Sequence, residues 1–199
     1  MRQPGCRTFV VFSLSLLSFI APSRAAAERT KYLAIIRGLE EPKGTKSGIL
    51  IEAREALLSE VDKHPELSLS LPSDLPMERE ALAAELRKRH LRAVEVSLNV
   101  LHVDRQLSPP APGKRFSTLS RKIHLTITGT QLPDWMVALT GDGEAEVASE
   151  VGPRDDLDKE ARSLLVDAAR AAVAQAMDEL VIKLRKGPPT PQVTKKHHR

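Results

Sequence analysis

Two histidines are the residues of this chain best suited to holding a metal ion, because neutral imidazole is a common metal ligand. His102 and His124 fall in two segments with the alternation of β-strands, and neighbouring strands would bring them close together. His102 shares parity with the apolar positions of residues 94–100, whereas His124 shares parity with the polar residues Lys122 and Thr126. We therefore expect the two imidazoles to face opposite ways, and we predict no metal site.

Three carboxylates invite comparison with general acid–base pairs, namely Asp104, Asp142 and Glu144. The sequence Gly141-Asp142-Gly143 lacks the aspartate-rich pattern of a calcium loop, so we predict a β-bulge or turn there. The spacing of acid–base pairs is not local in sequence. A small envelope hydrolase that uses these carboxylates therefore stays open as an alternative function.

Nucleophile motifs and phosphate-binding loops are missing from the sequence. No serine lies in G-x-S-x-G, and the one cysteine of the chain is Cys6, near its start. The turn-rich segment 38–48 separates Gly38 from Gly44 by five residues and has Thr45 where a phosphate-binding loop carries lysine. We therefore predict no cofactor, and we expect a protein that is not an enzyme.

A proline-rich segment is the best candidate for a binding element. Residues 104–120 contain three prolines and a glycine, and they predict a long linker between two strands. Long connections inside a compact domain often carry function. We predict that a partner protein binds here, through Lys114, Arg115, Phe116, Arg121 and Lys122.

A second group of basic residues lies at the end of a predicted helix, within residues 87–92. Its members are Arg87, Lys88, Arg89, His90 and Arg92. Positive charge at a helix C-terminus complements the helix dipole. We favour that explanation over a contact for acidic partners.

The periodicity of apolar residues predicts the elements that position these side chains. Helices are expected at 49–63, 77–90 and 155–184, and strands at 31–37, 67–71, 91–103, 121–130 and 135–140, the last kinked at Gly141 and resuming at 144–148. The order β-α-β-α-β-β-β-α predicts an α+β fold with one mostly antiparallel sheet of about five strands, packed by helices largely on one side. The long C-terminal helix is rich in alanine, which allows close packing against the sheet.

The first 27 residues have the three parts of a secretory signal peptide. Arg2 and Arg7 give a basic start, residues 8–21 are apolar, and residues 25–27 are alanines suited to cleavage. An apolar run of 14 residues is short for a hydrocarbon core of about 30 Å, so no membrane span is expected after processing. We predict a periplasmic or secreted protein with a single domain over residues 28–186.

Charge is distributed unevenly along the rest of the chain. Residues 28–182 hold 21 Lys and Arg against 26 Asp and Glu, whereas residues 183–199 hold six basic residues and no acidic one. A mildly acidic body weighs against a nucleic-acid-binding face, so no nucleic acid partner is expected. Residues 187–199 predict a disordered basic tail. Binding of anionic lipid or lipopolysaccharide through this tail is a further alternative function.

The order of elements between Lys31 and Leu184 resembles that of small α+β domains of the Gram-negative cell envelope. It is similar to the N-terminal domain of the Tol-system propeller protein, to the curli-secretion family and to the outer-membrane activators of penicillin-binding proteins. The last two are lipoproteins, and Cys6 precedes the apolar run rather than following it, so it does not match their lipid-attachment cysteine. The resemblance identifies no residue. It implies a non-catalytic interaction domain that binds another envelope component, which is the function we predict.

Overall fold

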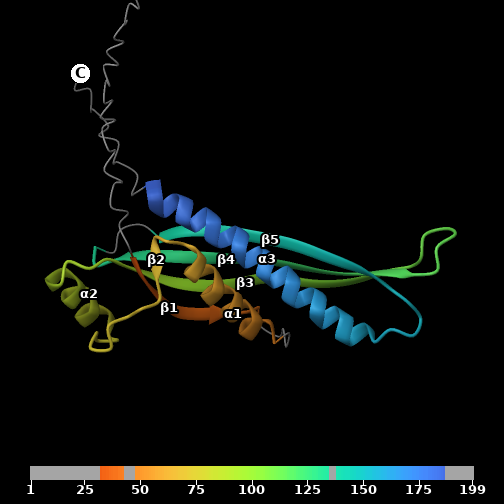
Figure 1. Cartoon of the computed structure of the whole chain (residues 1–199), viewed down its shortest axis with the longest axis horizontal. Coiled ribbons are helices and arrows are strands. Elements are labelled where there is room, and N and C mark those ends of the chain that lie inside the picture. The colour runs from red at the N-terminus through yellow and green to blue at the C-terminus, as the bar shows by residue number, and fades with distance from the viewer. Residues whose placement is uncertain (1–31, 43–47, 135–137, 187–199) are drawn as a thin grey trace, which may run out of the picture.

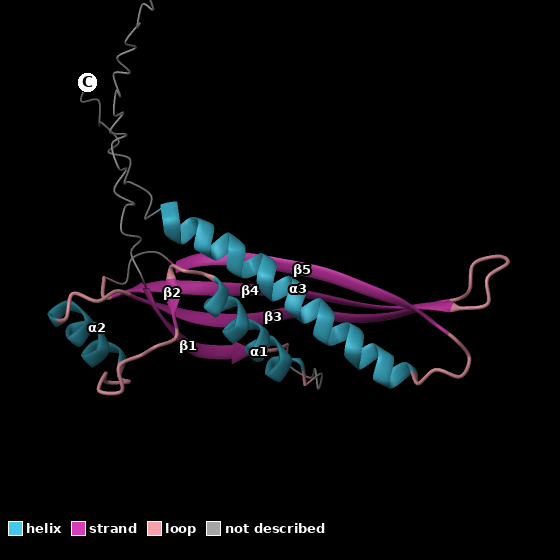
Figure 2. Cartoon of the chain, in the orientation of Figure 1, coloured by secondary structure: helices cyan, strands magenta, loops and turns pink. Residues whose placement is uncertain are grey.

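A computed structural model describes residues 32–42, 48–134 and 138–186. Its elements are β1 (Tyr32–Glu40), α1 (Ile49–Lys63), β2 (Leu67–Ser68), α2 (Arg79–Lys88), β3 (Ala93–Ser108), β4 (Ser117–Leu132), β5 (Ala138–Val151) and α3 (Leu157–Lys186). The order matches the prediction, and the strands form one sheet in the order β2-β1-β3-β4-β5 (Figures 1 and 2). The predicted α+β fold is confirmed. The signal segment, the C-terminal tail and Trp135 lie outside the described residues.

The sheet combines two kinds of pairing. β1 runs parallel to both β2 and β3, whereas β3, β4 and β5 form an antiparallel meander. β2 pairs over only two residues, which is much shorter than the alternation of residues 67–71 predicts. The antiparallel meander therefore makes up most of the sheet.

Helices cover the two faces of the sheet unequally (Figure 1). α1 and α3 pack on one face, here called the helix face, against strand residues such as Ala34 and Val94. The adjacent residues on the same strands, Ile35 after Ala34 and Ala93 before Val94, pack in a separate cluster with Leu82 and Leu86 of α2. Successive strand residues point to opposite faces, so α2 covers one end of the other face. The remainder of that face on β3, β4 and β5 is polar and is here called the polar face.

Two glycines on β5 let α3 approach the sheet closely. A Cβ atom built on Gly141 would lie 1.9 Å from the carbonyl oxygen of Ala176, and one on Gly143 would lie 1.9 Å from that of Ala172. β5 is paired with β4 without interruption through both glycines. The predicted bulge or kink at Gly141-Asp142-Gly143 is therefore wrong. The glycines of β5 have no side chain and the alanines of α3 have a small one, so the helix can pack directly against the backbone of the strand.

The strongest departure from the sequence analysis is the length of the β3–β4 hairpin. Pairing continues from Ala93↔Leu132 to Ser108↔Thr118, so only residues 109–116 connect the two strands. The predicted linker over residues 104–120 is therefore wrong at both ends. In residues 104–108 and 117–120 the only apolar residues are Leu107 and Leu119. These segments therefore lack the alternation of apolar and polar residues that identifies a strand in the sequence.

Among the described helices, none is long and apolar enough to cross a membrane.

Candidate functional site

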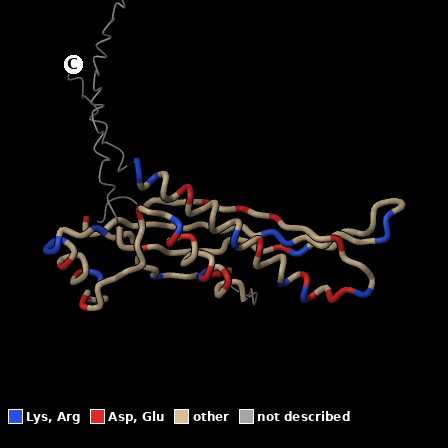
Figure 3. The backbone as a smooth tube through the Cα atoms, viewed as in Figure 1, with Lys and Arg blue, Asp and Glu red and all other residues tan. Residues whose placement is uncertain are grey.

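The β3–β4 hairpin carries the predicted binding loop to one end of the molecule. Figure 1 shows the tip of the hairpin projecting beyond the helices, at the end opposite to α2. Lys and Arg positions lie on the loop at this tip (Figure 3). Two paired strands of 16 residues each support the loop from below. The tip is therefore an exposed loop on an ordered base, which suits a binding element.

Apolar side chains are exposed at the same tip. Phe116 and Leu107 each retain 50% of their accessible surface. Phe116 lies against the turn between β5 and α3, where a Cβ atom on Gly152 would be 3.3 Å from its ring. Lys114 forms an ion pair with Glu150 of β5 at 3.3 Å. The tip thus presents half-exposed apolar surface beside the exposed cation Arg115.

Arg121 and Lys122 do not join the other three predicted site residues. Arg121 pairs in register with Arg105 on the helix face. Partial burial, and after it the charge of Arg105, lowers the pKa of Arg121. Arg105 is held by Asp158 at the start of α3, at 2.8 Å. Lys122 points to the polar face, where it forms an ion pair with Glu144. The five residues therefore divide among the hairpin tip and both faces of the sheet.

The three candidate carboxylates share the polar face without forming an acid–base pair. The Asp142 carboxylate accepts a hydrogen bond from Thr126 Oγ1 at 2.7 Å. The ammonium of Lys122 lowers the pKa of Glu144 through a hydrogen bond and its charge. Asp104 accepts from the Arg105 backbone N–H at 2.8 Å. A carboxylic acid that acts as a general acid needs a pKa raised toward neutrality. The pKa of Glu144 is shifted in the opposite direction.

The expectation that His102 and His124 face opposite ways is wrong. The register shifts by one residue between Val100 and His102, so Leu101 is an extra residue in β3. Beyond this bulge the parity of β3 is reversed, and His102 lies directly opposite His124 on the polar face. Even so, no three His, Cys, Asp or Glu residues gather closely enough to hold a metal ion in the part of the chain that is described.

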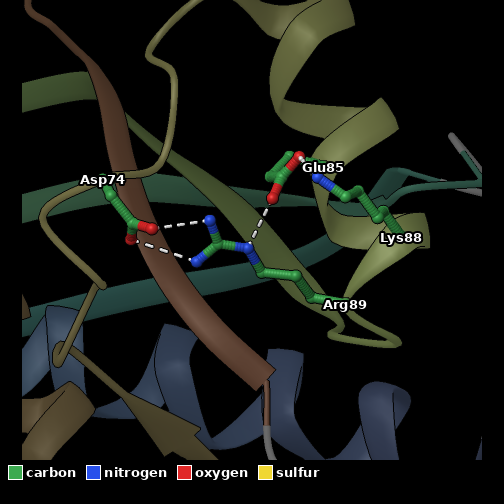
Figure 4. Close-up of polar contacts among 4 residues, drawn as sticks. All are labelled: Asp74, Glu85, Lys88 and Arg89. Atoms are coloured by element: carbon green, nitrogen blue, oxygen red, sulfur yellow. Dashed lines mark hydrogen bonds and ion pairs between the residues drawn. The ribbon is translucent and has the colours of Figure 1, made fainter.

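The basic cluster at the end of α2 is used inside the molecule. Arg89 donates to both carboxylate oxygens of Asp74, at 3.0 and 2.6 Å, and through Nε to Glu85 at 2.6 Å (Figure 4). These hydrogen bonds lower the pKa values of Asp74 and Glu85 and raise the pKa of Arg89. Arg87 donates to the carbonyl of Pro133 at 3.0 Å. The cluster therefore fixes α2 and the loop before it.

A buried carboxylate secures the other side of α2. Glu95 of β3 is 6% exposed and lies beneath the helix. Arg79 donates to it through Nε at 2.9 Å, and Arg37 of β1 pairs with its other oxygen at 2.9 Å. A buried charge needs such compensation. Glu95 is thus a structural anchor between α2 and the sheet.

The sequence analysis missed a row of α3 side chains that bind the edge of β5. Gln175, Glu179 and Lys183 are spaced four residues apart, so they lie on one stripe of the helix. The Asp142 backbone N–H donates to Glu179 at 2.9 Å, and the Glu144 N–H donates to Gln175 at 3.2 Å. Lys183 donates to the carbonyl of Thr140 at 2.6 Å. The four-residue spacing of these side chains can be read from the sequence, but the sequence does not show that they contact β5.

Comparison with known proteins identifies no family. No family of known proteins and no curated protein matches the sequence. Among solved structures, the chain is similar to a minor lipoprotein from Acinetobacter baumannii, at 13% identity and a TM-score of 0.38, covering 74% of this chain and 91% of that one. It is also similar to the rare lipoprotein B of Shewanella oneidensis, at 13% identity and a TM-score of 0.36, covering 76% and 98%.

A third similar structure is described as a neuraminyllactose-binding hemagglutinin homolog from Helicobacter pylori. It has 12% identity and a TM-score of 0.43, and it covers 85% of this chain and 86% of that one. Two of the three neighbours are therefore bacterial lipoproteins by description. At these identities and TM-scores the similarity assigns no activity to this chain.

Proposed function

We propose that this chain is a non-catalytic interaction domain that acts in the periplasm or outside the cell. In this proposal it binds a protein of the bacterial cell envelope through the tip of the β3–β4 hairpin. The observation that carries the proposal is the projecting tip, where half-exposed Phe116 follows the exposed Arg115 in the loop and half-exposed Leu107 lies near the end of β3. The signal-like start of the sequence supports the location.

The exposed apolar side chains at the tip would contribute binding free energy when a partner covers them. Aromatic and arginine side chains dominate the binding free energy of many protein interfaces. Phe116 is the one aromatic residue among the large apolar side chains that the described residues leave exposed. Covering the Phe116 ring and the aliphatic side chain of Leu107 would remove from water apolar surface that the fold leaves exposed, and such burial contributes about 25 cal/mol per Å².

The polar face offers less support for the hydrolase alternative. Each of its three candidate carboxylates has a different partner: the Arg105 N–H for Asp104, Thr126 for Asp142 and Lys122 for Glu144. The hydrogen bond from Lys122 lowers the pKa of Glu144. The tail alternative concerns residues outside the described part of the chain. Neither alternative has a structural observation in its favour.

Site-specific photo-cross-linking in the native cells tests the proposal. A photoreactive amino acid is placed at Phe116 and, as a control of matched exposure, at Ile182 of α3, which is 47% exposed. We expect one defined protein adduct at position 116 that is absent at position 182. A photoreactive residue at Leu107 should give the same adduct, and adding Arg115→Glu to that variant should abolish it. Equal adducts at both positions, or none at position 116, would contradict the proposal.

A further inference from the structure

β5 is the last strand of the sheet, and one of its sides faces away from β4. Its pairing with β4 is unbroken from Thr130↔Ala138 to Ser117↔Val151. In an antiparallel strand, the N–H and C=O groups of alternate residues point to the same side. Since the N–H groups of Asp142 and Glu144 reach α3 instead of β4, the even-numbered residues present their backbone outward.

α3 closes only the first part of this edge. The helix starts beside β3, where the carbonyl of Leu157 accepts from Arg105, and it ends beside β5, where Lys183 reaches Thr140. It therefore crosses the sheet diagonally. Its side chains bond the outward groups of Thr140, Asp142 and Glu144.

The later part of the edge is open. Glu146 and Ala148 continue the outward-pointing series, and both residues are exposed. In residues 138–186 and the other described ranges, no hydrogen bond reaches the outward N–H or C=O of either residue. α3 packs against the helix face of the same segment, through Val147 and Val151. The face is covered, and the edge is a row of unpaired backbone groups of the kind that accepts another strand.

The charges on this segment decide which strand it accepts. Glu146 and Glu150 lie on the polar face, on either side of Ala148. Antiparallel pairing of two copies about Ala148 would place each Glu146 opposite Glu150 of the other copy. Like charges directly opposite each other are destabilising, whereas opposite charges are stabilising. A second copy is therefore disfavoured. Glu150 has an exposed ion-pair partner in Lys114, whereas no ion pair of Glu146 is found among the described residues, so a basic strand is favoured most strongly at Glu146.

We propose that the edge of β5 from Glu146 to Glu150 binds an extended peptide segment that carries Lys or Arg four residues apart. The segment would extend the sheet by one strand through main-chain hydrogen bonds, with its cations opposite the two glutamates. Its intervening residues would lie beside Val147 and Ser149, so small or β-branched side chains fit there. This site adjoins the hairpin tip, because Lys114 of the tip pairs with Glu150 at 3.3 Å. Both side chains of that ion pair are exposed, so a cation of the peptide would compete with Lys114 for the carboxylate.

Fluorescence anisotropy with a labelled probe tests this proposal on the chain from residue 28 to residue 199. The probe is the peptide Thr-Lys-Val-Thr-Val-Lys-Thr with blocked ends, and the control peptide has Glu in place of both Lys residues. We expect saturable binding of the first peptide and no binding of the second. The double variant Glu146→Lys, Glu150→Lys should weaken binding about tenfold, because two attractive pairs become repulsive.

A proline substitution separates strand addition from simple charge attraction. Ala148→Pro removes one outward N–H, and the β4 pairing does not use that N–H, so an edge strand tolerates the change. We expect this variant to lose probe binding. The control variant Glu52→Lys, Glu55→Lys changes the net charge by the same amount as the β5 double variant, but on α1. It should bind the probe as the parent protein does. Phe116→Ala should also bind as the parent does, whereas it should reduce the cross-link proposed at the tip.

Amide hydrogen exchange gives a reading that does not depend on the proline variant folding. The Glu146 and Ala148 amides should become protected when the probe is added, and the Asp142 amide should not change. The proposal is overturned by an absence of binding, by unchanged exchange at both amides, or by equal loss of binding in the α1 control.

Discussion

The two parts of β5 share one strand and one neighbouring helix, yet they differ in how completely they are enclosed. From Thr140 to Glu144, the backbone of α3 packs directly against the glycines of the strand. Side chains of α3 also form hydrogen bonds with the outward backbone N–H and C=O groups of this part. Beyond Glu144 the same helix lies closer to β3, and among the described residues no hydrogen bond reaches the outward backbone groups of Glu146 and Ala148. The diagonal crossing of one helix therefore divides a uniform strand into a closed part and an open part.

The closed part should tolerate almost no added volume. Gly141→Val places side-chain carbon atoms where the Ala176 carbonyl lies, since even a Cβ atom would be 1.9 Å from that oxygen. We expect α3 to be displaced and the free energy of unfolding to fall by more than about 3 kcal/mol. Urea denaturation followed by circular dichroism measures the change.

The matched substitution in the open part is Ala148→Val. Its side chain is exposed on the polar face, and valine suits a strand, so the free energy of unfolding should change by less than about 0.5 kcal/mol. Equal effects at positions 141 and 148 would contradict the division of β5 into two parts.

Removing an edge contact should have a smaller effect than adding volume beneath the helix. Glu179→Ala deletes the acceptor of the Asp142 N–H, and water replaces it because this side chain is 41% exposed. We expect a loss of about 1 kcal/mol and faster hydrogen exchange of the Asp142 amide. The conservative variant Glu179→Gln keeps an acceptor and should restore part of the protection.

Arg162→Ala serves as the control for this prediction, because Arg162 is exposed near the start of α3, away from the closed edge. It should leave the Asp142 amide unchanged. Unaltered exchange in Glu179→Ala would show that the helix does not protect the edge.

The types and order of the elements were predictable because they depend on local periodicity. The alternation in β3 and β4, the alanine stripe of α3 and the acidic start of that helix all lie within single segments. The bulge at Leu101 also leaves a local signal, since the apolar positions change from even at Val100 to odd at Val103. Our interpretation assigned one parity to the whole strand, and the error reversed the direction of His102.

The contacts between distant elements were not predictable from the sequence in the same way. Glycine at positions 141 and 143 is compatible with a turn, a bulge or a close approach, and only the position of α3 distinguishes them. Lys114, Arg115 and Phe116 lie together because they are consecutive residues of one loop, and their role in binding a partner stays a prediction. Arg121 and Lys122 are neighbours in sequence but point to opposite faces, as adjacent residues of a strand must.

The smallest effect that separates the two parts of β5 concerns the charge state of Glu179. Lys183 lowers the pKa of Glu179 by a hydrogen bond, and the Asp142 N–H lowers it further. A lowered pKa in the folded state means that this group adds stability above its unfolded pKa of about 4.3, and that the contribution is lost as the pH falls through the folded value.

The chemical shift of the Asp142 amide proton, followed by NMR from pH 7 to pH 2, should report this titration. Its midpoint should lie below the ordinary glutamate value. In Lys183→Met the midpoint should rise, because the largest cause of the lowered pKa is removed. The Ala148 amide, which has no α3 side chain on it, should show the same pH response in both proteins. A midpoint that does not move in Lys183→Met would mean that Lys183 does not hold the closed edge, and the division of β5 would then rest on the glycine contacts alone.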